Sequence, residues 1–349
     1  MRKIVILAEG AFTPRSAKTA TGVLRYGQDQ VVAVIDSTRA NQDVSQALAD
    51  PTLGVGIPVV HDIHAALSLH PEALLIGIAP AGGALPTTWH GQLLTAMAAG
   101  LDIISGLHSF LSDDPELSQA AEQYGVHIWD VRRPAPSNRV ANFVPHRAES
   151  HTVLLVGSDC AVGKMTVALE LDREARRRGL NSAFLATGQT GIMIANDGLP
   201  VDHILSDFVA GMVEEKVLAY TNTHDWLFVE GQGALNHPGF SPVTLGLIHG
   251  SMPDAMIFCH KAGTLTIDGY PDNPLPSLNR LIQINEEAVR WLRPHTSNRV
   301  VGISLMTPGM SEEEARYEVK RVTQETGLPT TDALRFGVGN LLDALLSHH

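Results

Sequence analysis

Cysteine is scarce in this sequence, and long hydrophobic runs are missing from it. The 349 residues include only two cysteines, Cys160 and Cys259, which is too few for a disulfide scaffold and typical of a reducing cytosol. No apolar run approaches the roughly 18 residues that a membrane-spanning helix needs, and the apolar residues 4–7 are too short a segment for a signal peptide. We therefore expect a cytoplasmic protein without a membrane partner.

Positive charge is also in short supply. Lysine and arginine total 25 against 37 aspartates and glutamates, so the formal net charge is −12. A protein that coats nucleic acid would carry the opposite balance, and we expect no nucleic-acid partner. His-Glu-x-x-His and clustered Cys/His patterns are missing too, which argues against a structural zinc or iron site. The composition, 44% hydrophobic and 18% charged, is that of an ordinary globular protein long enough for two domains.

The most informative stretch is a glycine-rich loop between a strand and a helix. Residues 153–156 predict a buried strand, and residues 165–178 have helical spacing that ends at Gly179. Strand, Gly-Lys loop and helix are typical of a phosphate site, because loop N–H groups and the helix dipole attract an anion. The alternative is an ordinary strand-to-helix turn. The predicted cofactor-binding residues are Gly157, Ser158, Asp159, Cys160, Ala161, Val162, Gly163, Lys164, Met165 and Thr166.

This loop departs from the usual phosphate-loop motif in two ways. Five residues instead of four separate Gly157 from Gly163, and Met165 stands where Ser or Thr normally follows the lysine. That hydroxyl holds Mg²⁺ in nucleoside triphosphatases, and a thioether is a poor ligand for so hard an ion. The loop is therefore suited to holding phosphates and less suited to cleaving or transferring one, although Thr166 restores a hydroxyl one position later.

Acidic residues beyond the loop are candidates for proton transfer. Trp226–Val229 reads as a buried strand, and Glu230 follows it in a glycine-rich stretch, where it could act as general base or hold Mg²⁺ together with Thr166. An ordinary solvated turn is the alternative for Glu230. Asp202 could serve as base, bind Mg²⁺ or a substrate amine, or simply cap the following helix, whereas capping is the expectation for Asp207.

The first 150 residues alternate short apolar runs with helical patterns, which predicts a parallel sheet covered on both faces. Asp36 ends the second strand, where a Rossmann fold places a ribose-binding acid, but the three-glycine fingerprint is absent. Two glycine-containing stretches, residues 78–83 and 106–108, follow strands and could approach a ligand or simply turn. The expected strands are residues 3–8, 31–35, 57–60, 73–79, 101–105 and 126–131, and the expected helices are residues 13–26, 63–69, 86–99 and 115–124.

A stretch rich in proline and polar residues separates this half from the phosphate loop, and gives predicted domains of residues 1–135 and 152–349 with a linker at 136–151. In the second domain, residues 187–191 are expected to form a flexible polar turn. The further expected strands are residues 182–186, 254–260, 300–306 and 330–333, and the expected helices are residues 208–220, 279–292, 311–327 and 340–346.

With both halves laid out, the whole chain resembles a family long catalogued as a domain of unknown function, with a Rossmann-like N-terminal half and a P-loop C-terminal half. The resemblance is carried by residues 157–166, 187–191, 207–211, 230–233 and 302–304. The P-loop half is also similar to dethiobiotin synthetase, whose relatives share a long loop and a Val-Glu-Gly-x-Gly stretch with a metal-binding Glu. The resemblance implies two α/β domains, each with a parallel sheet.

One branch of that family is described as D-glutamate N-acetyltransferase, which implies acetyl-CoA as cosubstrate, a small amino acid as acceptor and, from the P-loop relatives, a homo-oligomer. In that case Lys164 and the loop hold the phosphates of acetyl-CoA, and Glu230 or Asp202 deprotonates the amine. Arg280, Lys261 and Arg139 are candidates to bind the substrate carboxylates.

Two other functions stay open at this point. The first is an ATP-dependent ligase or kinase of the dethiobiotin synthetase type, which would need Mg²⁺ held by Thr166, Glu230 and Asp159. The second is a non-catalytic nucleotide-binding protein, which would bind its ligand without turnover.

Overall fold

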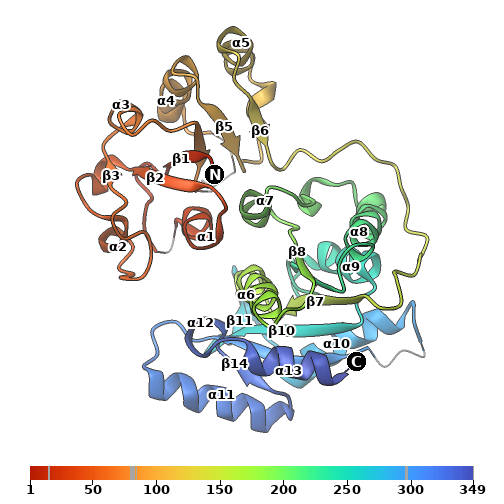
Figure 1. Ribbon diagram of the computed structural model, residues 1–349. Helices are drawn as coiled ribbons and strands as arrows, with labels where there is room; N and C mark the ends of the chain where they lie inside the picture. The colour runs from red at the N-terminus through yellow and green to blue at the C-terminus, as the bar shows by residue number, and fades with distance from the viewer. Residues whose placement is uncertain (15, 79–82, 84, 295–297, 349) are drawn as a thin grey trace. The chain divides into compact units, whose positions relative to one another are not determined.

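The computed structural model describes residues 1–14, 16–78, 83, 85–294 and 298–348, and the chain forms two compact units (Figure 1). One unit comprises Met1–Pro134 together with Gln189–Pro200, and the other comprises Ala135–Gly188 together with Val201–His349. The chain thus returns to the first unit for twelve residues after the phosphate loop and its helix. That return was not predicted from the sequence.

The first unit is built on a six-stranded parallel sheet. Its strand order is β3-β2-β1-β4-β5-β6, the order of a classic dinucleotide-binding fold. The central strands are buried along almost their whole length, as expected where helices cover both faces. The strands are β1 (Lys3–Leu7), β2 (Gln30–Ile35), β3 (Val59–Val60), β4 (Ala73–Ile76), β5 (Asp102–Ser105) and β6 (Ile128–Asp130).

Helices fill the connections of this sheet, and three of them differ from the expected pattern, one of them because residues 44–47 form a short helix where none was expected. The predicted helix of residues 13–26 begins only at Lys18. The predicted flexible turn at 187–191 is wrong, because a helix begins at Gln189 and packs on α1, where the hydroxyls of Thr19 and Thr190 lie 2.9 Å apart. The helices of this unit are α1 (Lys18–Tyr26), α2 (Val44–Ala47), α3 (Ile63–Leu67), α4 (Thr87–Ala98), α5 (Pro115–Tyr124) and α7 (Gln189–Ala195).

The second unit has its own six-stranded parallel sheet, in the order β14-β13-β10-β7-β9-β8. Strand β7 lies between β10 and β9, and its residues from Thr152 to Gly157 are buried. The strand that leads into the phosphate loop is therefore central, and its neighbours end beside the loop. The strands are β7 (His151–Gly157), β8 (Ser182–Leu185), β9 (Trp226–Val229), β10 (Ala255–Lys261), β13 (Val300–Met306) and β14 (Thr330–Thr331).

Two groups of helices pack on this second sheet. Helices α6 and α13 contact each other and the sheet, and α8, α9 and α10 form a second group (Figure 1). The expected helix of residues 311–327 begins with a capping box, in which Ser311 and Glu314 cap each other's backbone. The helices are α6 (Lys164–Arg177), α8 (Ser206–Thr221), α9 (Ser241–Ser251), α10 (Leu278–Arg290), α11 (Glu312–Thr326), α12 (Ala333–Phe336) and α13 (Gly339–His348).

The structure of α8 contradicts the capping role expected for Asp207. A small hairpin, described below, was not predicted from the sequence. Asp207 does not cap α8, because Leu205 occupies the N-cap position and Asp207 lies in the first turn. Between β10 and α10, β11 (Thr266–Ile267) and β12 (Tyr270–Pro274) form a small antiparallel hairpin. Across the described ranges, no helix combines the length and apolar character needed to cross a membrane.

Candidate active site

The phosphate loop starts at the end of β7 and closes onto the first turn of α6. Gly157 has no room for a side chain, since a β-carbon there would lie 2.7 Å from the Cys259 carbonyl oxygen and 2.8 Å from Val162. Gly163, at φ +94°, occupies the N-cap of α6 and supplies no side-chain cap. The first N–H groups of α6 are consequently left for a ligand, which makes this end of the helix suited to an anion.

Lys164 places a buried positive charge at this helix end. Its side chain is 6% exposed, and Nζ donates a hydrogen bond to the Asp159 carbonyl oxygen over 2.7 Å. This is the one hydrogen bond of Nζ within the described part of the chain, so the ammonium retains donors for a ligand. Burial lowers the pKa of Lys164, and acidic groups around it, Glu230 included, act in the opposite direction.

Glu230 stands at the tip of β9, directly beside β7, and is 4% exposed. Its Oε2 accepts hydrogen bonds from the N–H groups of Thr187 (2.9 Å) and Gly188 (3.2 Å), and Oε1 accepts one from Gln232 Nε2 (3.1 Å). Burial nevertheless raises the pKa of Glu230 to about 7, because the loss of solvent outweighs these donors and the charge of Lys164.

Gly231 explains how the lysine and the carboxylate come together. A β-carbon at Gly231 would lie 1.6 Å from the Leu155 carbonyl oxygen and 3.0 Å from Cδ of Lys164. The glycine therefore lets the tip of β9 approach β7 closely and leaves a path for the lysine stem. The buried cation of Lys164 and the buried carboxylate of Glu230 thereby lie at the same carboxyl edge of the sheet, as their places in the sequence predicted.

Two predicted loop residues turn their side chains into the protein. The Ser158 hydroxyl is hydrogen-bonded to His260 Nδ1 at 2.8 Å, and its N–H donates to the Cys259 carbonyl oxygen. Burial lowers the pKa of His260 to about 4, which keeps this ring neutral near pH 7. The Asp159 carboxylate accepts from the N–H groups of Cys160 and Asp268, both within 2.7 Å, and so fastens the β11–β12 hairpin to the loop.

One group of side chains at the loop has the composition of a metal site. Asp159, Cys160 and His237 each present a potential ligand atom within 4.8 Å of the others. The Gly239 N–H, however, donates to His237 Nδ1 at 3.1 Å, so the neutral ring carries its proton on Nε2. An ion at His237 would have to displace one of these hydrogens, and the arrangement fits a hydrogen-bonded loop better than a metal centre. Met165 and Thr166 are partly buried in the first turn of α6.

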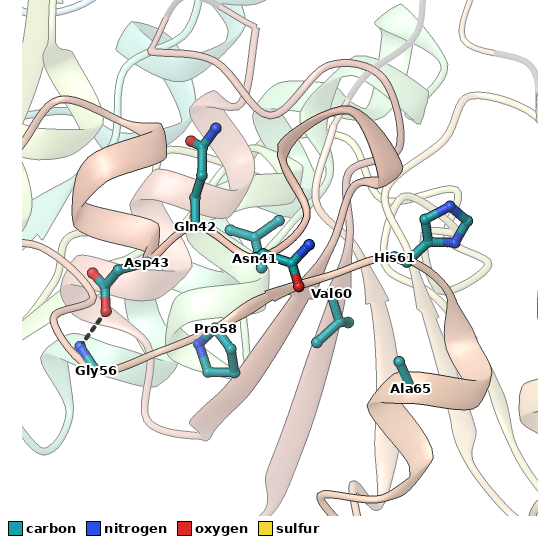
Figure 2. A pocket seen from close by; sticks show the side chains of 9 residues that line it. Asn41, Gln42, Asp43, Gly56, Pro58, Val60, His61 and Ala65 are labelled. Atoms are coloured by element: carbon teal, nitrogen blue, oxygen red, sulfur yellow. Dashed lines mark hydrogen bonds between the residues drawn. The ribbon is translucent and has the colours of Figure 1, made fainter.

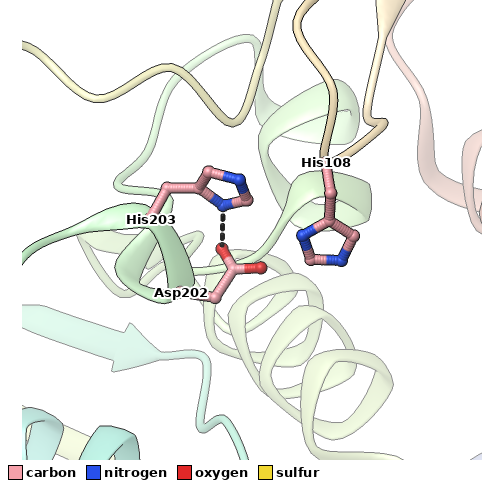
Figure 3. Close-up of side chains that lie close together, drawn as sticks. All are labelled: His108, Asp202 and His203. Atoms are coloured by element: carbon pink, nitrogen blue, oxygen red, sulfur yellow. Dashed lines mark ion pairs between the residues drawn. The ribbon is translucent and has the colours of Figure 1, made fainter. Parts of the chain in front are cut away.

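Asp202, the other candidate base, follows Val201, whose N–H donates to the Thr187 carbonyl oxygen at 3.2 Å. It is exposed in a short 3₁₀ turn, Val201–His203, and its Oδ1 is 3.5 Å from Nδ1 of His203 (Figure 3). Its carboxylate keeps access to solvent, whereas that of Glu230 is buried.

The three candidate cations for substrate carboxylates differ in what surrounds them. Arg139 lies 3.7 Å from the buried Glu214, and Arg280 lies 3.4 Å from Glu287. Lys261 is exposed and has no ion pair or hydrogen bond of its side chain with the described residues. Cys259, two residues before it, pairs with Gly157 across the strands, so Lys261 lies at the same sheet edge as the loop.

Two of the candidate ligand positions of the first unit, Asp36 and Gly106, are occupied by the protein itself. The buried Asp36 accepts hydrogen bonds from Phe12 N–H and from the backbone and hydroxyl of Thr38, which uses both of its oxygens. A β-carbon at Gly106 would lie 2.9 Å from Gln189 Cγ, so this glycine accommodates α7. Of the stretch 78–83, residues 79–82 lie outside the described residues.

A hollow of about 410 Å³ at the edge of the first sheet was not suggested by the sequence (Figure 2). Its wall contains a hydrogen bond from the Gly56 N–H to the Asp43 carboxylate, 2.6 Å long, and among the described residues that line it only Asp43 and His61 are titratable. The lining residues are Asn41, Gln42, Asp43, Gly56, Pro58, Val59, Val60, His61 and Ala65.

Sequence reasoning missed the side chains that surround the loop from a distance in the chain. Asn236 Nδ2 donates to the Ser158 carbonyl oxygen at 3.0 Å, and His237 and the hairpin approach the same loop. The one signal for them was the continuation of the stretch after Glu230 into Gly-Ala-Leu-Asn-His, which places polar residues just past a strand tip.

Comparisons with known proteins agree with this architecture. Residues 37–134 match the Rossmann-like domain, and residues 139–342 the P-loop domain, of the family described as domain of unknown function DUF1611. A crystal structure of a DUF1611 family protein from Anabaena variabilis superposes with a TM-score of 0.91, at 38% identity, over 99% of this chain and 100% of that one. The predicted fold class, two α/β domains with parallel sheets, is confirmed.

Two relatives carry a functional name. A D-glutamate N-acetyltransferase from Tritonibacter scottomollicae is 38% identical over 332 residues, which are 95% of this chain and 94% of the relative. A D-glutamate N-acetyltransferase from a Pseudoalteromonas species is 34% identical over 277 residues, 79% of this chain and 82% of the relative.

Proposed function

The chain belongs to the DUF1611 family, and from that premise we propose that this N-acetyltransferase transfers the acetyl group of acetyl-CoA to the amino group of D-glutamate. The names of the two relatives support the acceptor. The phosphate loop supports the donor, because coenzyme A carries a pyrophosphate and a 3′-phosphate that an anion cradle can hold.

The observation that carries this proposal is the buried Lys164 at the start of α6 together with the buried Glu230 at the neighbouring tip of β9. Lys164 and the uncapped start of α6 provide positive potential for phosphates. Met165 leaves the position after the lysine without the usual Mg²⁺ ligand. Such a site holds a phosphate-bearing cosubstrate without activating its phosphoryl groups.

Glu230 is the proposed general base. With acetyl-CoA bound, the amine attacks the thioester carbonyl, so that the C–N bond forms, the C–S bond breaks and coenzyme A leaves as its thiolate. The attacking amine must lose a proton as the amide bond forms, and Glu230 passes that proton on to the thiolate, which leaves as free thiol. A carboxylate whose pKa is about 7 accepts that proton at neutral pH and remains a strong enough acid to release it afterwards. Three hydrogen bonds hold the carboxylate in one orientation.

Lys261 is the proposed partner of a substrate carboxylate. It is exposed at the same sheet edge as the loop, whereas Arg139 and Arg280 already face acidic groups. An amino dicarboxylate needs such a cation for orientation, because an unpaired carboxylate loses solvation on binding.

The direct experiment mixes the purified protein with acetyl-CoA and either D-glutamate or L-glutamate and follows release of free thiol. We expect release with D-glutamate, little with L-glutamate, and a strongly reduced rate for Lys164→Met. The matched control is Lys320→Met, an exposed lysine on α11, which should leave the rate unchanged.

A parallel assay with ATP, Mg²⁺ and the same amino acids separates the alternatives. ADP formation without thiol release would replace the acetyltransferase with a ligase or kinase. Tight binding of acetyl-CoA or ATP with neither product would indicate a non-catalytic nucleotide-binding protein.

A further inference from the structure

Three aromatic rings form a cluster next to the phosphate loop, all within the second unit. The rings of His237 and Phe240 stack with centroids 4.5 Å apart and an interplanar angle of 25°. Tyr270, from β12 of the hairpin, meets His237 edge-on at 5.4 Å and 86°. Stacked and edge-to-face contacts are the favourable geometries for such rings, so the cluster is a packed arrangement.

The cluster keeps its centre buried and its two outer rings open to solvent. His237 is only 3% exposed, whereas Phe240 is 49% and Tyr270 39% exposed. Single exposed aromatic rings are common on protein surfaces. Here, however, two of them rest on one buried ring, which holds both in fixed positions. A rigid and partly uncovered aromatic surface is what a flat ligand ring requires.

The segments that carry the rings are fastened directly to the loop. Asn236, next to His237, donates to the Ser158 carbonyl oxygen at 3.0 Å. The hairpin that carries Tyr270 is fixed through Asp268, whose N–H donates to the Asp159 carboxylate at 2.7 Å. A ring nitrogen of His237 lies within 4.8 Å of Asp159 and Cys160. The outer rings, which both contact His237, therefore belong to segments fixed beside the loop.

A position beside the loop suits the base of a nucleotide whose phosphates the loop holds. One ribose stands between the phosphates of a nucleotide and its base, so a base whose phosphates occupy the loop must lie a short distance to one side of it. Every base has a flat π face that stacks on aromatic side chains. The ring of His237 is held by the Gly239 N–H on Nδ1, which fixes the orientation of the stack.

We propose that Phe240 and Tyr270 bind the adenine ring of the nucleotide whose phosphates the loop holds. For coenzyme A as that nucleotide, this assignment rests on the proposed function. In this arrangement His237 supports the two outer rings, and Phe240 and Tyr270 contact the base. The three rings take no part in the acetyl transfer itself, so they affect only how tightly the cosubstrate binds.

Equilibrium binding of three probes tests this subsite: coenzyme A, adenosine 3′,5′-bisphosphate and inorganic pyrophosphate. Phe240→Leu and Tyr270→Leu keep an apolar side chain but remove the flat ring. We expect each to weaken binding of both adenine-containing probes on the order of 10-fold or more, and to leave pyrophosphate binding unchanged. Tyr317→Leu, at an exposed tyrosine on α11, is the matched control and should change nothing.

The possible outcomes distinguish this inference from the function on which it rests. If wild-type protein binds coenzyme A and both variants bind it equally well, the adenine subsite is refuted while the acetyltransferase stands. If the variants also bind pyrophosphate equally more weakly, the adenine subsite is likewise refuted, because the rings would then act on the loop itself. If coenzyme A fails to bind, the proposed donor is wrong, and the comparison is repeated with ADP as a fourth probe. Weaker ADP binding by both variants would then support the adenine subsite. Unchanged ADP affinity in the variants, or no ADP binding by the wild type, would refute it. Thermal unfolding of each variant checks that it is folded.

Discussion

At the scale of single residues, Glu230 combines burial, three hydrogen bonds and a neighbouring cation. The hydrogen bonds and Lys164 favour its charged form, and burial favours its neutral form strongly enough to raise the pKa to about 7. A carboxyl group at its usual pKa near 4 would be a much weaker base at neutral pH. The environment of the strand tip therefore supports the role of general base that we propose for this side chain.

The pH dependence of acetyl transfer should follow this group. Because the base acts in its ionised form, kcat/KM should rise as pH increases through about 7 and level off above it. Glu230→Gln keeps the size and one oxygen acceptor but cannot accept the proton. We expect this variant to lose that rise and about 10²- to 10⁴-fold of the rate.

The control for this profile is Glu313→Gln, an exposed glutamate in the first turn of α11. It should reproduce the wild-type curve. Retention of the full rate and the same pH profile in Glu230→Gln would transfer the role of base to another group, with Asp202 the next to test.

Several residues of the site could be predicted from sequence, and others could not. Lys164 and Glu230 follow apolar runs that end in glycine-rich stretches, and this pattern alone places them at the edge of a parallel sheet. The inward direction of Ser158 and Asp159 could not be predicted, because it depends on His260 and Asp268, about a hundred positions away. The residues next to Ser158 and Asp159 in the sequence do not indicate such distant partners.

At the scale of elements, periodicity found the long strands and helices and missed the short or uniformly apolar ones. Helix α9 contains two glycines and several β-branched residues, and it is partly buried on more than one side. Its sequence therefore lacks the one-sided apolar pattern by which an amphipathic helix is recognised. The hairpin of β11 and β12 contains glycine and prolines that read as a loop. The helix α7 begins with polar residues and glycine, which is why it was predicted as a turn.

The closeness of β9 to β7 leads to a prediction at this scale. A β-carbon at Gly231 would overlap the Leu155 carbonyl oxygen, 1.6 Å away, so Gly231→Ala must push the two strands apart. We expect a lower melting temperature by thermal unfolding, a stability loss of several kcal/mol at a buried overpacked position, and little acetyl transfer.

Gly91→Ala provides the comparison for that variant. Gly91 lies within α4 and a β-carbon there would have nothing within 4 Å, so alanine should be neutral or stabilise by up to about 1 kcal/mol. Equal melting temperatures for Gly231→Ala and wild type would show that the strand tips do not need this close approach.

At the scale of the whole molecule, one chain builds two parallel sheets, each with its own core. The order of the two domains and their fold class could be predicted, because alternating apolar runs and helical patterns report local structure reliably. The assignment of Gln189–Pro200 to the first unit could not, since it depends on packing between α1 and α7, which are more than 160 residues apart.

The most direct test compares acetyl-CoA with S-acetyl-pantetheine, which carries the same thioester but no phosphates, as donors for wild type and Lys164→Met. If the loop and Lys164 hold the phosphates, wild type should prefer acetyl-CoA in kcat/KM, and Lys164→Met should lose roughly 10- to 100-fold of that preference, the value of a charge-assisted hydrogen bond. An unchanged preference in Lys164→Met would show that the phosphates bind elsewhere and would contradict the assignment of the loop.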